Sequence, residues 1–317
     1  MFYAHNYDGR THLLKDHLIS VASLCGQGMF YNIGLLHDFG KYRPNFQQYL
    51  FGGTFHPSEK THSVAGALYL MNQFKNNVDP HTIAIGMIAI ACHHTGLVDD
   101  IGSRLSGMLA ANEFSESLNE ESRNLQLQPV VKISGDISMN VRMALSRLVD
   151  ADWRDTASFY GNHVSYKFSD MVLLNNMLDI HLSKFEPQNE IDEIRNIILE
   201  DCKSASKKSC GWFSLSVPTG GGKTLSSMSF AIRHAIEHNK NRVIVVIPYT
   251  SIIDQSHAVY AKIFGDDNVL AHHSNITPSE EYRQKSQRWE NPIIVTTSVQ
   301  FLETLMASKT TKLRKLH

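Results

Sequence analysis

The stretch PTGGGKT, residues 218–224, decides the fold of the second part of the chain. Its three consecutive glycines permit a tight turn in which backbone N–H groups converge. The run KTLSSMSFAIRHAIEH (223–238) follows at once and is predicted to be a helix, and the apolar run WFSLSVP (212–218) before it is predicted to be a short strand. A strand, a glycine-rich turn and a helix in this order are typical of a unit in a parallel α/β sheet.

Two further apolar runs extend this pattern downstream. RVIVVIP (242–248) and NPIIVTTS (291–298) are rich in β-branched residues, as expected of strands buried on both faces of a parallel sheet. A helix-like stretch lies between them. Strands that alternate with helices predict a parallel-sheet α/β domain over residues 188–317.

The first part of the chain has helical periodicity instead. Its apolar residues recur at i, i+3, i+4 and i+7, the spacing that places side chains on one face of a helix. The predicted helices include residues 14–25, 62–74, 81–94 and 138–156.

The composition also changes along the chain. Eleven of the 17 histidines precede residue 190, and the acidic excess of the first part gives way to a slight basic excess. Pro187 lies at this change. We therefore predict an all-α domain over residues 1–187, followed by the start of an α/β domain over residues 188–317.

Charge and cysteine content exclude several classes of protein. The 317 residues carry 30 basic and 31 acidic side chains, so nucleic-acid contacts have to come from local patches. The four cysteines form no CxxC pair, which argues against a zinc ribbon or a disulfide framework and suits a reducing cytoplasm. No signal-peptide core and no apolar run of about 18 residues is present. We expect a cytoplasmic protein without a membrane partner.

Several histidines and aspartates fall on apolar helix faces. His17 lies within the apolar stripe of residues 14–25, and His93 follows apolar or small residues three, four and seven positions earlier. Asp152 shares such a face, whereas Asp150 falls beside Arg154 on a more polar one. A buried carboxylate needs a cation, a proton or a metal. An arginine partner is therefore the alternative to a metal for Asp152, and Asp150 remains a second candidate ligand.

The first domain thus collects a set of potential metal ligands: His17, His37, Asp38, His62, His93, His94 and Asp152. Imidazole and carboxylate together suit Mn, Fe, Co, Ni or Zn rather than an all-oxygen Mg site. The set exceeds the four or so ligands that one zinc needs, so we expect two ions. The other histidines of this part are expected on the surface or in loops: His5, His12, His56, His81, His163 and His181.

The ordered series resembles the HD superfamily of metal-dependent phosphohydrolases. It is most similar to the HD nuclease domain of the CRISPR-associated nuclease-helicases of type I systems. The resemblance covers nearly all of residues 5–160 and is carried by short motifs: DHL around His17, HDFGK (37–41), HS (62–63), HH (93–94) and VDADW (149–153). It implies that Asp38 bridges two metal ions and that the His37–Asp38 pair takes part in catalysis.

Lys41 is a further candidate catalytic residue. It follows His37 by about one helical turn, from where its ammonium could hold a phosphate oxygen. A solvated surface lysine is the alternative.

The glycine-rich turn has the chemistry of a phosphate-binding loop. Converging N–H groups and a helix N-terminus both favour phosphate. Val217 stands where the strict GxxxxGK[ST] pattern requires glycine, but PTGGGKT resembles the variant P-loop of superfamily 2 helicases. Lys223 would then reach the β and γ phosphates and Thr224 would bind the Mg of Mg-ATP. The nucleotide-binding set is Pro218, Thr219, Gly220, Gly221, Gly222, Lys223 and Thr224.

Two more segments resemble superfamily 2 helicases. PYTSIIDQ (248–255) and TTSVQFLETL (296–305) match segments that contact single-stranded DNA, and their hydroxyls suit sequence-neutral phosphate contacts: Thr250, Ser251, Thr296 and Thr297. No Asp-Glu box follows residue 290. The resemblance implies a RecA-like lobe that is incomplete, so we do not expect ATPase or helicase activity from these 317 residues.

Three functions follow. The first is a metal-dependent endonuclease for single-stranded DNA in CRISPR antiviral defence, which the resemblance pairs with an RNA-guided surveillance complex. The second is an HD-type nucleotide phosphohydrolase, which leaves the helicase-like segments unexplained. The third is an inactive fragment that only binds DNA or a partner.

Overall fold

The computed structural model describes residues 1–54, 62–100, 117–161, 166–273 and 280–317. The chain divides into two compact units. The first contains residues Met1–Val164 and Thr304–His317, and the second contains Ser165–Glu303. None of the described helices is long and apolar enough to cross a membrane.

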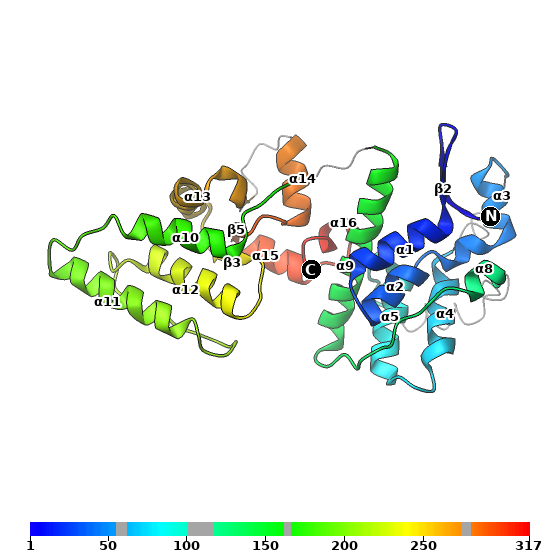
Figure 1. Ribbon diagram of the computed structural model, residues 1–317, viewed down its shortest axis with the longest axis horizontal. Helices are drawn as coiled ribbons and strands as arrows, with labels where there is room; N and C mark the ends of the chain where they lie inside the picture. Colours follow the sequence, from blue (N-terminus) through cyan, green and yellow to red (C-terminus); the bar gives the residue numbers. More distant parts are fainter. Residues whose placement is uncertain (55–61, 101–116, 162–165, 274–279) are drawn as a thin grey trace. The chain divides into compact units, whose positions relative to one another are not determined.

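The first unit is mostly helical. Four helices form its centre and pack on one another: α1 (Leu14–Cys25), α2 (Met29–Leu36), α5 (Pro80–Cys92) and α9 (Ile137–Phe159) (Figure 1). Shorter elements surround them: η1 (Phe39–Tyr42), α3 (Pro44–Leu50), α4 (Ser63–Phe74), α8 (Glu120–Arg123) and α16 (Thr310–Leu313). The predicted helices at 14–25, 62–74, 81–94 and 138–156 are thus present within one to three residues of their predicted ends.

Side-chain caps set two of the helix starts. Asp79 accepts a hydrogen bond from the Thr82 N–H at the start of α5, and Asp136 accepts one from the Met139 N–H at the start of α9. The apolar stripes of the four central helices then bury their side chains in one core. Among the largest fully buried side chains are Leu14, Leu18, Leu36 and Ile90.

The N-terminus adds a feature that the all-α prediction missed. Strands β1 (Tyr3–Tyr7) and β2 (Arg10–Leu13) form an antiparallel hairpin. The turn is Asp8–Gly9, and both residues have positive φ, 50° and 73°. This dipeptide is a preferred two-residue hairpin turn, because it tolerates that backbone conformation. The first unit is therefore α-helical with a small hairpin at its start.

A glycine lets α4 approach the end of α2. A Cβ on Gly66 would lie 1.8 Å from the carbonyl oxygen of Leu36. Leu36 is the last residue of α2 and directly precedes His37, so this close approach brings α4 to the His37–Asp38 turn.

We expect Gly66→Ala to destabilise the protein by about 1–3 kcal/mol, because the added methyl forces two well-packed helices apart. Urea unfolding followed by circular dichroism measures this. Gly211→Ala is the matched control, since its Cβ would meet no atom closer than 4.0 Å. Equal midpoints for the two variants would contradict the close packing of α2 and α4.

The second unit contains a three-stranded parallel sheet in the order β3–β5–β4. The strands are β3 (Val243–Ile247), β4 (Val269–His272) and β5 (Ile293–Thr297), and Val243 pairs with Ile293. The remaining elements are α10 (Met171–Leu182), α11 (Glu190–Ala205), α12 (Lys223–Glu237), α13 (Thr250–Phe264), η3 (Asp266–Asn268), α14 (Glu280–Arg288) and α15 (Ser298–Leu305). The two β-branched runs are thus strands of a parallel sheet, as predicted.

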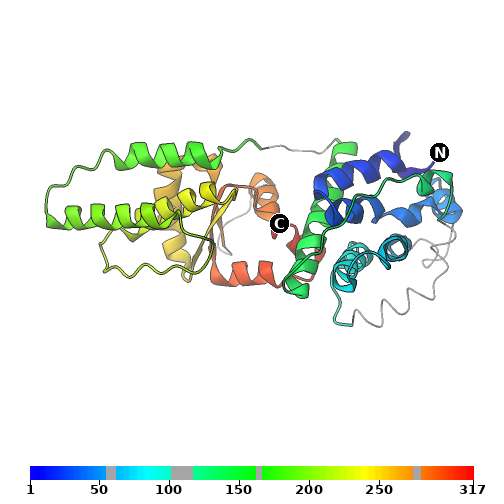
Figure 2. The same cartoon turned by 60° about the horizontal axis from the view of Figure 1, so that its bottom comes forward.

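Helices surround this sheet. α12 packs against α10 and α11 (Figures 1 and 2), and α13 packs against all three strands. β5 is buried along its whole length, as predicted, whereas β3 is only partly buried and its Val246 is exposed, contrary to the prediction. The described sheet and its helices are consistent with a RecA-like domain.

The prediction of a strand at residues 212–218 is wrong. This segment has no regular secondary structure and is not paired with the described sheet. Trp212 is fully exposed, and Phe213 and Leu215 are also exposed. Apolar sequence alone predicted a strand here, but no neighbouring strand supplies the pairing that would form one.

The compact units divide earlier than residue 187. α10 packs against α12 and α13, which places residues 166–187 with the sheet. At the other end, residues 304–317 belong to the first unit, where the Ser308 carbonyl accepts a hydrogen bond from the Leu97 N–H and Ser146 Oγ donates to the Leu313 carbonyl. Both differences arise from contacts distant in sequence.

Candidate functional site

The seven predicted ligands come from five places in the first unit. His17 lies on α1 and Asp152 on α9. The His37–Asp38 pair directly follows α2, His62 precedes α4, and the His93–His94 pair directly follows α5. The structure brings all seven together around Asp38.

One oxygen of Asp38 faces a first group of ligands. Asp38 Oδ2 lies 3.3 Å from His17 Nε2 and 3.3 Å from His37 Nε2. Asp152 Oδ1 lies 3.6 Å and 3.8 Å from the same two nitrogens. His17, His37 and Asp152 can therefore converge on a single ion beside Oδ2.

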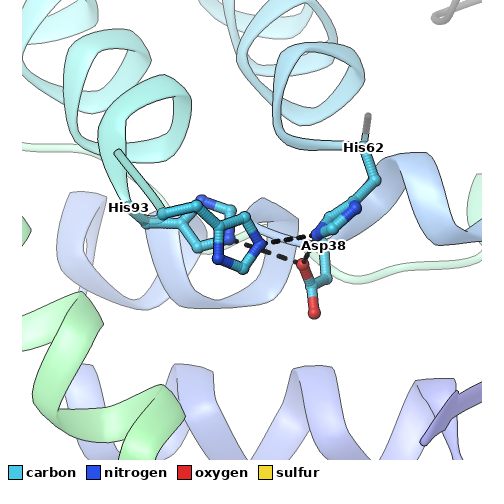
Figure 3. Close-up of side chains that lie close together, drawn as sticks. Asp38, His62 and His93 are labelled. Atoms are coloured by element: carbon cyan, nitrogen blue, oxygen red, sulfur yellow. Dashed lines mark hydrogen bonds and ion pairs between the residues drawn. The ribbon is translucent and has the colours of Figure 1, made fainter. Parts of the chain in front are cut away.

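The other oxygen of Asp38 faces a second group. Asp38 Oδ1 lies 3.1 Å from His62 Nε2 and 3.5 Å from His93 Nε2, and Figure 3 shows both imidazoles directed at the carboxylate. His94 Nε2 lies 2.6 Å from His62 Nε2. Asp38, His62, His93 and His94 thus form a second set with metal-ligand geometry.

Two buried atoms in the second group support a cation. Asp38 Oδ1 and His93 Nε2 make no hydrogen bond of good geometry within the described chain, although they lie 3.5 Å from each other and Asp38 Oδ1 lies 3.1 Å from His62 Nε2. Leaving buried polar atoms unsatisfied costs free energy, which a bound cation would offset. The ring of His93 is held in place because its Nδ1 donates to the Ile90 carbonyl at 2.6 Å, and that of His37 because its Nδ1 donates to the Gly34 carbonyl at 2.8 Å. Such hydrogen bonds orient metal-ligating imidazoles.

Lys41 is buried rather than solvated. Its ammonium lies 2.6 Å from Asp38 Oδ2 and donates to the Ala4 carbonyl at 3.3 Å. The solvated-lysine alternative is therefore wrong. Lys41 holds the Asp38 carboxylate directly, and its predicted contact with phosphate stays a prediction.

Asp38 and His37 each stabilise the charged form of the other. Burial alone would raise the pKa of Asp38, but His37, Lys41 and His62 lower it well below its usual value. Burial likewise opposes the charge on His37, yet the Asp38 carboxylate, together with Asp152, raises its pKa to about 10. Burial lowers the pKa of His93, which keeps that ring neutral and able to bind a metal.

The two candidate aspartates on α9, Asp150 and Asp152, have different surroundings. Asp152 faces the histidines, whereas Asp150 is buried against Arg154 (2.5 Å) and Arg314 (3.0 Å). The more polar face expected for Asp150 is covered, because residues 304–317 pack over it. Among the two candidates, the geometry favours Asp152 as a ligand.

Sequence reasoning missed Asp155. Its Oδ2 accepts a hydrogen bond from His17 Nδ1 at 2.6 Å, which fixes the His17 ring with Nε2 directed at Asp38. A carboxylate behind a ligating histidine orients the ring and raises its basicity. The signal was present, because Asp155 follows Asp152 by three positions and shares its helix face.

His5 and His12 also lie at this site. The hairpin places them against His17, with ring centroids 5.1 Å and 5.5 Å from it, and burial lowers the pKa of His5 to about 3. The expectation that they are surface residues is wrong, because the unpredicted hairpin folds back over α1. His56 and His163 lie outside the described residues.

We expect Asp155→Asn to weaken binding of Mn²⁺ by about 10- to 100-fold, since the His17 ring loses its anionic partner. Competition with a fluorescent chelator measures the affinity. Asp16→Asn, an exposed change on the same helix as His17, should leave it unaltered. If Asp155→Asn binds Mn²⁺ as tightly as the wild type, Asp155 does not position His17.

The glycine-rich loop of the second unit has the predicted conformation in part. Gly220 and Gly222 have φ of +85° and +78°, and Gly222 directly precedes α12, which starts at Lys223. The Lys223 ammonium donates a hydrogen bond to the Val217 carbonyl at 2.6 Å, and Val217 lies in the segment that was predicted to be a strand. Arg195 on α11 donates to the Gly220 carbonyl at 2.9 Å and secures the loop.

This loop borders a cavity of about 780 Å³ beside α11. Thr219, Gly220, Gly222, Lys223 and Thr224 are among its lining residues. Pro218 and Gly221 form the turn itself, in which the Gly221 N–H donates to the Pro218 carbonyl. A cavity of this volume matches the size of typical small-ligand sites.

The hydroxyls of two predicted DNA-contacting residues are engaged within the protein. Thr296 Oγ1 donates to the His272 carbonyl, and Thr297 Oγ1 accepts from the Gln300 N–H at the start of α15. Both residues are buried. Ser251, by contrast, is exposed in the first turn of α13, next to Thr250.

The comparisons with known proteins agree with this architecture. Residues 190–317 match the DEAD/DEAH box helicase family. No curated protein matches the chain. Crystal structures of T. fusca Cas3 with ADP, AMPPNP and ATP are similar, with TM-scores of 0.64, 0.63 and 0.61 and identities of 13%, 14% and 14%.

These alignments cover 99% of this chain but only 45% of each Cas3 chain, so the chain spans less than half the length of those proteins. At identities this low, the structural similarity establishes a shared fold and nothing more. Residues 190–317 are therefore similar to the DEAD/DEAH box helicase family, and the chain shares a fold with Cas3.

Proposed function

We propose that the first unit is an HD-type, metal-dependent endonuclease that cuts single-stranded DNA in type I CRISPR interference. The observation that carries this proposal is the position of Asp38, whose two carboxylate oxygens face two separate groups of ligands. A carboxylate between two such groups is the arrangement expected for a bridging ligand. The Cas3-like fold and the helicase match supply the link to DNA.

The residues present fit a pair of divalent transition-metal ions, of which Mn, Ni, Co, Fe and Zn are the candidates. His17, His37 and Asp152 would hold one, His62, His93 and His94 the other, and Asp38 both. Such ions supply an activated water and neutralise phosphate charge. The protein orients His17 through Asp155 and Asp38 through Lys41.

For the second unit we propose that the loop Pro218–Thr224 contributes to a nucleotide site. The cavity beside this loop, the helix start at Lys223 and the family match over residues 190–317 support it. This site would hold Mg-ATP. The proposed partners are single-stranded DNA and, by analogy with Cas3, an RNA-guided surveillance complex in the cytoplasm.

Cleavage of circular single-stranded DNA tests the proposal. The purified chain is incubated without ATP and with Mn²⁺, Ni²⁺, Co²⁺ or Mg²⁺ in turn, and deoxynucleoside triphosphates serve as parallel substrates. We expect circles to be opened with transition metals and the triphosphates to stay intact. Triphosphate hydrolysis without DNA cutting would assign the site to a nucleotide phosphohydrolase, and no turnover of either substrate would leave only a binding role.

A further inference from the structure

A separate set of potential metal ligands lies in the second unit. It is distant in sequence from the seven ligands gathered around Asp38, which we call the HD cluster. Cys210, His234 and His238 each offer a ligand atom, and these atoms all lie within 4.8 Å of one another. His234 lies in the last turn of α12, His238 is the C-cap residue four positions later, and Cys210 comes from the segment between α11 and the glycine-rich loop. We propose that these three residues bind a zinc-class divalent ion.

The two imidazoles are prepared as ligands by the backbone of that same segment. His234 Nδ1 donates to the Ser206 carbonyl at 2.7 Å, and His238 Nε2 donates to the Lys208 carbonyl at 2.9 Å. A carbonyl oxygen can only accept a hydrogen bond, so each ring carries its proton on the bonded nitrogen. A neutral imidazole then keeps a lone pair on its other nitrogen, and such carbonyl partners are typical of metal-binding histidines.

Packing fixes the orientation of one ring further. His234 stacks on Phe230 with a centroid distance of 5.2 Å and an interplanar angle of 13°, and the edge of Phe213 contacts it at 5.4 Å. The His234 and His238 rings lie 4.3 Å apart. A site held in this way loses little side-chain entropy when it binds an ion.

The chemistry of the set selects the ion. One thiolate and two imidazoles suit Zn²⁺ or Co²⁺ rather than Mg²⁺ or Ca²⁺, which prefer oxygen ligands. Zn–S and Zn–N bonds of about 2.3 and 2.0 Å place bonded ligand atoms roughly 3.3–3.8 Å apart. Cys210 is exposed, so its side chain can rotate to close the remaining distance. Three protein ligands leave a fourth position for water.

The consequence is a clamp on the entrance to the glycine-rich loop. The ion would tie Cys210 to the end of α12, and residues 211–217 then lead directly into the loop at Pro218. This segment has no regular secondary structure and is mostly exposed. Neither the metal nor the clamp depends on nuclease activity in the first unit.

Cobalt provides a direct test, because the HD cluster contains no cysteine and only a thiolate ligand gives a sulfur-to-cobalt charge-transfer band. The chelator-treated chain is titrated with Co²⁺. We expect the band in the wild type and in Cys202→Ser, and its loss in Cys210→Ser. A band that persists in Cys210→Ser, or no band in the wild type, would overturn the proposal.

Two further measurements cover the histidines and the unmodified protein. His238→Gln should weaken Zn²⁺ binding at the cysteine-containing site at least about tenfold, and His257→Gln, outside the cluster, should not. In the wild type, one added equivalent of Zn²⁺ beyond those taken by the HD cluster should slow alkylation of Cys210 at least tenfold, and a chelator should restore it. Unchanged alkylation with zinc would also overturn the proposal.

Discussion

Asp38→Ala is expected to reduce metal-dependent cleavage of single-stranded DNA by at least about 1,000-fold per folded molecule. Asp38 lies between both ligand groups, with one oxygen 3.3 Å from His17 and His37 and the other 3.1 Å from His62. Its loss therefore removes a ligand from each proposed ion. Two metal ions supply several kcal/mol of charge stabilisation, and about 4 kcal/mol corresponds to roughly 1,000-fold in rate.

The measurement is the initial rate of opening of circular single-stranded DNA with Mn²⁺, normalised to folded protein by circular dichroism. Asp16→Ala is the control, because Asp16 is exposed on α1 beside His17 and should retain the wild-type rate. Cleavage by Asp38→Ala within tenfold of the wild type would show that the HD cluster is not the nuclease site.

Asp150 and Asp152, both on α9, should separate catalysis from stability. Asp152→Ala is expected to reduce cleavage by about 100-fold or more with little effect on unfolding, because Asp152 faces the histidines and is partly exposed. Asp150→Ala is expected to lower the free energy of unfolding by about 3–5 kcal/mol. It leaves the buried guanidinium of Arg314 without the carboxylate 3.0 Å away.

Urea unfolding and cleavage rates on the same four samples, including the wild type and Asp16→Ala, distinguish the two roles. Among molecules that remain folded, Asp150→Ala should cut DNA at close to the wild-type rate. The reverse pattern, with Asp150→Ala inactive and Asp152→Ala unstable, would mean that the ligand assignment on α9 is wrong.

Helical periodicity predicted much of the first unit. The i, i+3, i+4 pattern placed His17 and His93 on buried faces, and the structure agrees. Periodicity fixes the face of a helix but not what packs against it. It placed Asp152 on the buried face and Asp150 on a more polar one. The structure instead buries Asp150 against residues 304–317, a contact more than 150 residues away in sequence, and leaves Asp152 partly exposed.

The features that the sequence analysis failed to predict have local and non-local causes. The hairpin that brings His5 and His12 to the site had a local signal, the Asp8–Gly9 turn, which the reading as a helical domain overlooked. The exposed segment before Pro218 had apolar sequence without a strand to pair with, and pairing is a tertiary property. Asp155 also had a local signal, its place three residues after Asp152 on the same helix face, but the sequence did not show that His17 would need a partner on its second nitrogen.

The account rests on Asp38 as a carboxylate shared by two ions, and anomalous X-ray diffraction from crystals grown with Mn²⁺ tests this most directly. Data collected at the manganese edge should show two peaks about 3.5–4 Å apart, one beside each oxygen of Asp38. His17, His37 and Asp152 should surround one peak, and His62, His93 and His94 the other. A single peak that does not involve Asp38, or none among these side chains, would contradict the account.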